Sequence, residues 1–136
     1  METSGRQALT TPDDIIALAE ALSRLADGLH DTLRRLTAAP SGDATTAYAL
    51  LTEEYALRAR TNILRNDAQH HTLDGLSFEQ AALMKTIEQI DADLKSATTL
   101  PAIRSLLSDL MTFASSINPG KAKVVNFLAQ ELGVRS

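Results

Sequence analysis

Leucine and isoleucine recur in the first third of the chain at alternating steps of three and four residues. The positions are Ile15, Leu18, Leu22, Leu25, Leu29 and Leu36, with Leu33 beside them. This spacing is typical of an amphipathic helix with a heptad-like seam. Thr11 can cap the first turn and Pro12 suits the first helical position. The pattern therefore predicts a helix that begins there and ends at residues 38–42, where proline and glycine interrupt it.

The second predicted helix runs from residue 43 or 44 to about residue 71, and a turn at residues 72–75 follows it. Ser77 and Gln80 then have the spacing of a capping box, which predicts the start of a third helix. The apolar stripe of this helix consists of Leu83, Ile87, Ile90, Leu94 and Ala97.

Pro101 restarts the helical pattern as a fourth helix, after a short break at residues 96–99. Its apolar face comprises Ile103, Leu106, Leu107, Leu110, Phe113, Ala114 and Ile117. The Asn-Pro-Gly sequence at residues 118–120 is the strongest break in the chain. A short fifth helix follows and stops at Gly133. We expect its inward positions to be Val124, Val125, Leu128 and Leu132.

These elements predict an all-α fold, an up-down-up-down four-helix bundle with a short fifth C-terminal helix. We expect residues 11–134 to form one helical-bundle domain and residues 1–10 to be a flexible N-terminal tail. Because the connections are short, consecutive helices should be antiparallel neighbours. The first two helices are longer than the next two, so their hairpin should project or pack against a second chain.

Composition narrows the chemistry that this chain can perform. Of its 136 residues, 44% are hydrophobic and none is cysteine, which excludes disulfides, thiolate metal sites and a cysteine nucleophile. A net charge of −4 argues against nucleic acid as a partner. No apolar run is long enough for a membrane span, and we expect no membrane partner. The expected compartment is the cytoplasm.

The second predicted helix carries an anomaly. Its apolar stripe includes Tyr48 and Tyr55. Farther along the helix, the same face carries a row of polar residues in place of apolar ones. The candidate site residues there are Tyr48, Glu54, Tyr55, Arg58, Asn62 and Arg65. Three interpretations are open. The helix can rotate so that the row is solvated. Alternatively, Glu54 pairs with Arg58 in a buried network, or the arginines bind an anion or a partner's carboxylate.

Metal and cofactor chemistry has weaker support. The candidates for a metal site are Asp67, His70, His71 and Glu79. The helix dipole already accounts for histidines near a helix C-terminus, so we expect no metal and no cofactor. Phosphate-loop, nucleophile-elbow and H-E-x-x-H motifs are absent, so an enzymatic role is uncertain and disfavoured.

The favoured hypothesis is a non-enzymatic interaction protein, which forms a homodimer or docks a helical protein partner. The alternative is a helical bundle that binds a small molecule, an anion or a metal through its second helix.

Overall fold

The computed structural model describes residues 7–38 and 44–135, and within these the regular structure is entirely helical. The elements are α1 (Pro12–Thr37), α2 (Ala44–Asn66), a 3-10 turn η1 (Ala68–His70), α3 (Gln80–Lys95), α4 (Leu100–Ser116) and α5 (Ala122–Leu132). The expected all-α fold is confirmed, and the contacts between the helices are those of a helical bundle.

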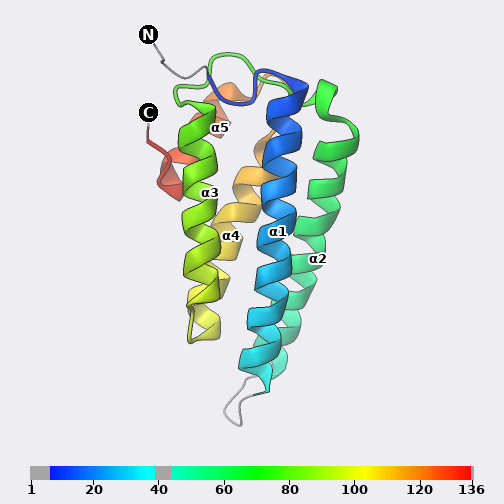
Figure 1. The fold of residues 1–136 in the computed structure, drawn as a ribbon, viewed down its shortest axis with the longest axis vertical. Coiled ribbons are helices and arrows are strands. Elements are labelled where there is room, and N and C mark those ends of the chain that lie inside the picture. Colours follow the sequence, from blue (N-terminus) through cyan, green and yellow to red (C-terminus); the bar gives the residue numbers. More distant parts are fainter. Residues whose placement is uncertain (1–6, 39–43, 136) are drawn as a thin grey trace.

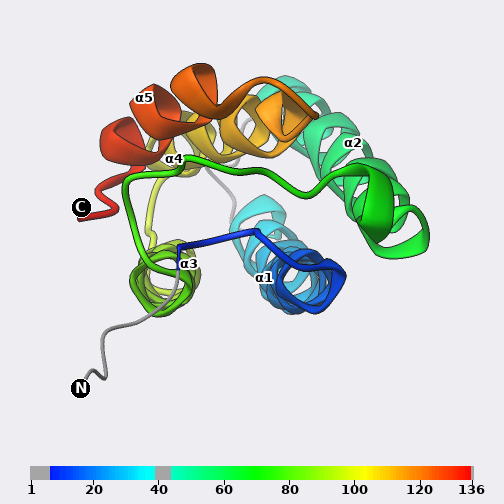
Figure 2. The ribbon, with the colours of Figure 1, turned by 90° about the horizontal axis from the view of Figure 1, so that it is seen from above.

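The helices are not arranged in space in the order of the sequence. α1 packs against both α2 and α3, α2 packs against α4, and α5 lies on α4 (Figure 1). The segment 71–79 crosses one end of the bundle and carries the chain from α2 over to α3 (Figure 2). The prediction that consecutive helices are neighbours is therefore wrong for α2 and α3, and α3 makes only sparse contact with α4.

Local capping signals explain several helix ends. The Oγ1 atoms of Thr11 and Thr99 accept hydrogen bonds from the backbone N–H groups of Asp14 and Ala102, at 3.2 and 3.4 Å. Gly133 ends α5 in the left-handed conformation, with φ of 101°. The cap at Thr11 and the stop at Gly133 were predicted from the sequence, and the structure confirms them. For α4 the sequence predicted only the break at residues 96–99 and the restart at Pro101, and the structure adds Thr99 as the cap.

The predicted capping box at Ser77 and Gln80 is wrong. α3 begins at Gln80 itself, and the N-cap position belongs to Glu79. The Gln80 side chain accepts a hydrogen bond from the backbone N–H of Leu9 and donates one to the carbonyl of Asp14. Ser77 instead donates from its backbone and its hydroxyl to Asn126. Contacts between distant segments have replaced a local cap.

Residues 7–10, which we expected to be part of a flexible tail, pack on the bundle, while residues 1–6 lie outside the described residues. Ala8 and Leu9 are fully buried. The backbone of Leu9 accepts a hydrogen bond from Leu73 N–H at 2.8 Å. Leu9 also has φ of 59°, a left-handed conformation that costs about 1–2 kcal/mol for a residue with a side chain. The burial of its side chain and its two backbone hydrogen bonds offset that cost.

The predicted seam of α1 is buried within this chain except at Leu36, which is partly exposed. Ile15, Leu18, Leu22, Leu25 and Leu29 are all inaccessible to solvent, so no second chain is needed to cover them. On α5, Val125 and Ala129 are buried, and the predicted inward residues Leu128 and Leu132 are partly buried against the core. The prediction that Val124 points inward is wrong, because 47% of its surface is exposed. Within the described part of the chain, every helix is too short or too polar to traverse a lipid bilayer.

Candidate functional site

The buried face of α2 contains two polar positions. Its inward residues follow one another at steps of three and four, as Ala47, Leu50, Glu54, Leu57, Thr61 and Leu64. Glu54 and Thr61 thus occupy places that a uniform bundle seam would give to apolar side chains. The apolar stripe is narrower than we expected, because Tyr48 and Tyr55 lie outside it.

Glu54 is the centre of a charged cluster between α1 and α2. Its side chain is almost completely buried, at 2% relative exposure. One carboxylate oxygen, Oε1, lies 3.0 Å from His30 Nδ1, and the other, Oε2, accepts a hydrogen bond from Arg58 Nε at 2.9 Å. Arg58 Nη1 donates in turn to Asp27 Oδ1 at 2.8 Å. Both oxygens of the buried carboxylate therefore have partners, as a buried charge requires.

The electrostatics of the cluster keep Arg58 charged. Burial alone lowers the pKa of Arg58, but its hydrogen bonds to Asp27 and Glu54 outweigh burial and raise the pKa above its ordinary value. A carboxylate can only accept hydrogen bonds, so the contact with Glu54 requires a proton on Nδ1 of His30. The cluster joins α1 to α2 through charge-assisted hydrogen bonds, which matches the buried-network interpretation of Glu54 and Arg58.

The other predicted site residues do not join this cluster. Asn62 is exposed, and its Oδ1 accepts a long hydrogen bond of 3.4 Å from Nη1 of the partly buried Arg65. Tyr48 and Tyr55 point into solvent, with 75% and 65% of their surfaces exposed. The six candidate residues are thus divided among a buried cluster, a surface pair and two exposed aromatic rings.

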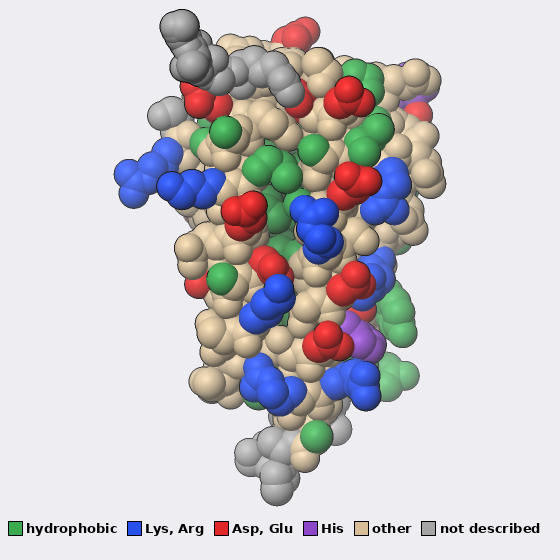
Figure 3. Space-filling view, viewed as in Figure 1, with side chains coloured by type: hydrophobic (Ala, Val, Ile, Leu, Met, Phe, Trp, Pro, Cys, Tyr) green, Lys and Arg blue, Asp and Glu red, His purple; other side chains and the backbone are tan. Residues whose placement is uncertain are grey.

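The exposed rings belong to a face of α2 that carries no charged side chain. The exposed residues of α2, within its described side chains, are Thr45, Tyr48, Ala49, Thr52, Tyr55, Ala56, Ala59, Asn62, Ile63 and Asn66. We call this set the α2 outer face. The charged residues of the helix are all buried or partly buried beside it. The side of the molecule formed by α1 and α3 differs, because acidic and basic side chains alternate across it (Figure 3).

Arg60 is a structural residue that the sequence did not single out. Its Nε donates to the carbonyl of Ala114 at 2.9 Å, and its Nη2 donates to the carbonyl of Ile117 at 2.6 Å. The last carbonyls of a helix have no partner within the helix, so Arg60 caps α4 from α2. Burial lowers the pKa of Arg60 from its ordinary value. His30 and Asp27 were also missed as partners of α2, and their only sequence signal was their place on the neighbouring helix.

The candidate metal ligands are only partly brought together. Asp67 contacts His70 through their side chains, and its carbonyl oxygen lies 2.9 Å from Nδ1 of His71. Over residues 7–38 and 44–135, no three histidine, aspartate or glutamate side chains are grouped closely enough to hold a metal ion. The contacts of Asp67 instead stabilise the end of α2 and the 3-10 turn that follows it.

Comparisons with known proteins give no relative: no family model, no curated protein and no solved structure matches this chain.

Proposed function

We propose that this protein is a non-enzymatic interaction module that forms a homodimer through the α2 outer face. The observation that carries the proposal is the lack of charge on that face, together with its exposed Tyr48, Tyr55 and Ile63. Interface centres are depleted in charged residues and enriched in aromatic ones. The framework we propose is an up-down-up-down four-helix bundle with α5 beside α4, and the proposed compartment is the cytoplasm.

Charge favours a second copy of this chain as the occupant of the face. Each copy carries a net charge of −4, so two copies repel one another wherever charged surfaces meet. In a two-fold dimer the same patch meets itself, and any charge on the patch would face its own copy. The α2 outer face avoids this penalty because its exposed side chains are neutral.

The pattern of side-chain sizes supports an antiparallel register for the two α2 helices. If the two-fold axis passes between Tyr55 and Ala56, each large side chain lies level with a smaller or aliphatic one. Tyr55 is then level with Ala56 of the second copy, Thr52 with Ala59, and Tyr48 with Ile63. The contact runs along roughly 30 Å of helix at 1.5 Å per residue. Alternating large and small side chains allow two helices to interdigitate.

Sedimentation equilibrium tests this function. A contact made by one helix face is at the small end of protein interfaces, so we expect reversible association in the micromolar range. Over loading concentrations from about one to several hundred micromolar, the mean mass should rise from 14.6 kDa toward twice that value. A mass that remains at the monomer value over the whole range would reject the homodimer.

A further inference from the structure

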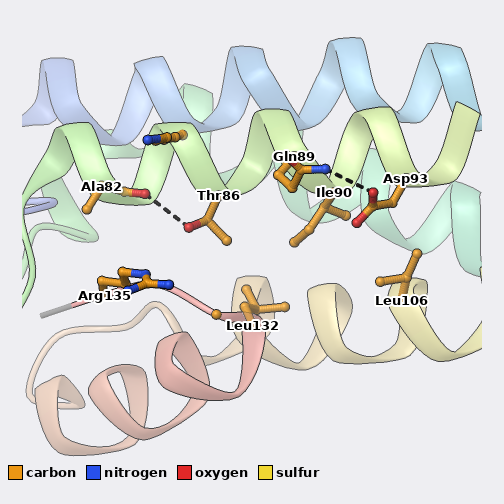
Figure 4. Close-up of a pocket in the computed structure, with 10 residues that line it drawn as sticks. Ala82, Thr86, Gln89, Ile90, Asp93, Leu106, Leu132 and Arg135 are labelled. Atoms are coloured by element: carbon orange, nitrogen blue, oxygen red, sulfur yellow. Dashed lines mark hydrogen bonds between the residues drawn. The ribbon is translucent and has the colours of Figure 1, made fainter.

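A groove lies on a different side of the molecule from the α2 outer face, where α3 and α4 make sparse contact. It has a volume of about 780 Å³ and is lined by one side of α3, by Leu106 of α4 and by the end of α5 with the residues after it. Figure 4 shows Leu106 and Leu132 along one wall and residues of α3 along the other. Pockets for small ligands commonly have volumes of about 300–1,000 Å³.

The chemistry of the groove is divided along its length. Apolar side chains line its middle, where Ile90 faces Leu106 and Leu132 (Figure 4). Arg135 and Asp93 lie at opposite ends of the groove in this view. Lys85 also lines the groove, and neither Lys85 nor Arg135 has a hydrogen bond or ion pair with any described residue. Asp93 differs, because its Oδ1 accepts a hydrogen bond from Gln89 Nε2 at 3.0 Å.

We propose that this groove binds an aliphatic carboxylate, with its anionic head at Lys85 and Arg135 and its hydrocarbon tail along Ile90, Leu106 and Leu132. Arg135 presents a planar fork of donors that suits a carboxylate, and Lys85 adds a second positive charge. The tail removes the exposed parts of the apolar wall from water. Asp93 sets the orientation, because its negative charge repels an anionic head at the far end of the groove.

Charge and volume distinguish this occupant from a helical protein partner. The groove has the volume of a small-ligand pocket, and two cations without a partner line it. Lys85 lies in α3 between Ala82 and Thr86, which Figure 4 shows toward the Arg135 end of the groove. A helix would instead require a long, evenly apolar channel. The groove shares no residue with the α2 outer face. A failure of the carboxylate proposal would therefore leave the homodimer proposal unaffected, and the reverse is also true.

Isothermal titration calorimetry with decanoate, below its critical micelle concentration, tests the proposal. Decanoate should bind saturably at one site per chain, and decylamine, which has the opposite charge and the same total number of carbons, should bind at least about tenfold more weakly. The double variant Lys85→Ala/Arg135→Ala should lose about tenfold in affinity for decanoate.

The matched control is Arg24→Ala/Lys123→Ala, which removes two exposed cations of α1 and α5 that do not line the groove. Decanoate should bind this control as tightly as it binds the unmodified protein. The proposal is overturned if decanoate and decylamine bind equally, if the groove variant and the control lose the same affinity, or if decanoate does not bind. Backbone NMR spectra of each variant establish that it is folded, and decanoate should shift the signals of Ile90 and Leu106 rather than those of α2.

Discussion

Replacing Tyr55 with lysine is expected to abolish self-association while the monomer remains folded. In the proposed register Tyr55 lies beside the two-fold axis, so a dimer of the variant would bring two lysine ammonium groups together at the centre of the interface. Juxtaposed like charges at an interface cost several kcal/mol, which corresponds to a loss of more than about 100-fold in affinity. Tyr55 is 65% exposed in the monomer, so the substitution leaves the core intact.

Phe127→Lys is a matched control for this variant. Phe127 of α5 is an aromatic residue with a similar exposure of 61%, and its replacement changes the net charge by the same amount. Sedimentation equilibrium should show a dimer for Phe127→Lys and a monomer for Tyr55→Lys. If Tyr55→Lys associates as strongly as the unmodified protein, the α2 outer face is not the interface.

Truncation of Glu54 should have the largest effect on stability among the polar substitutions in α2. In Glu54→Ala, His30 and Arg58 lose their buried acceptor and the side chain leaves a cavity. Removal of one partner from a buried ion pair costs about 3–5 kcal/mol. Because Arg58 is one-third exposed and keeps its bond to Asp27, we expect a smaller decrease, about 2–3 kcal/mol, in the free energy of unfolding. Urea denaturation followed by circular dichroism measures it.

Glu54→Leu distinguishes the role of the charge from the role of the volume. Leucine would continue the apolar seam between Leu50 and Leu57, and buried ion pairs are often replaced by apolar residues without loss of stability. We therefore expect Glu54→Leu to unfold within about 1 kcal/mol of the unmodified protein. Glu53→Ala, at the partly buried neighbouring position, is the control and should change stability by less than about 0.5 kcal/mol. Equal stabilities for Glu54→Ala and Glu53→Ala would show that the cluster contributes nothing.

Helix identity and several helix ends were predictable because their causes are local. Thr11, Thr99 and Gly133 cap their helices through contacts with residues only a turn away. The spacing of the leucines indicates which face of each helix is buried. The start of α3 was not predictable in this way. Gln80, the first residue of α3, accepts a hydrogen bond on its side chain from the backbone N–H of Leu9. Leu9 lies far from Gln80 in the sequence, so no local capping pattern could reveal this contact.

The candidate site was predicted only in part, for two physical reasons. A helical wheel counts a tyrosine ring as apolar, although its hydroxyl allows the ring to stand in water, and so Tyr48 and Tyr55 were placed on the wrong face. The pairing of Glu54 with Arg58 follows from their spacing of four residues, whereas the contacts with His30 and Asp27 depend on how α1 packs against α2. The groove could not be predicted from the sequence, because it depends on how α3, α4 and the end of α5 pack against one another.

The homodimer through the α2 outer face is tested most directly by disulfide cross-linking, since the natural chain contains no cysteine. Ala56→Cys places one thiol beside the proposed two-fold axis, where the two copies approach closely enough for a disulfide. Ala92→Cys places a thiol at another exposed alanine, on α3. Under mild oxidation in the micromolar range, Ala56→Cys should become a covalent dimer while Ala92→Cys remains monomeric. Equal rates of cross-linking for the two variants would contradict the proposed interface.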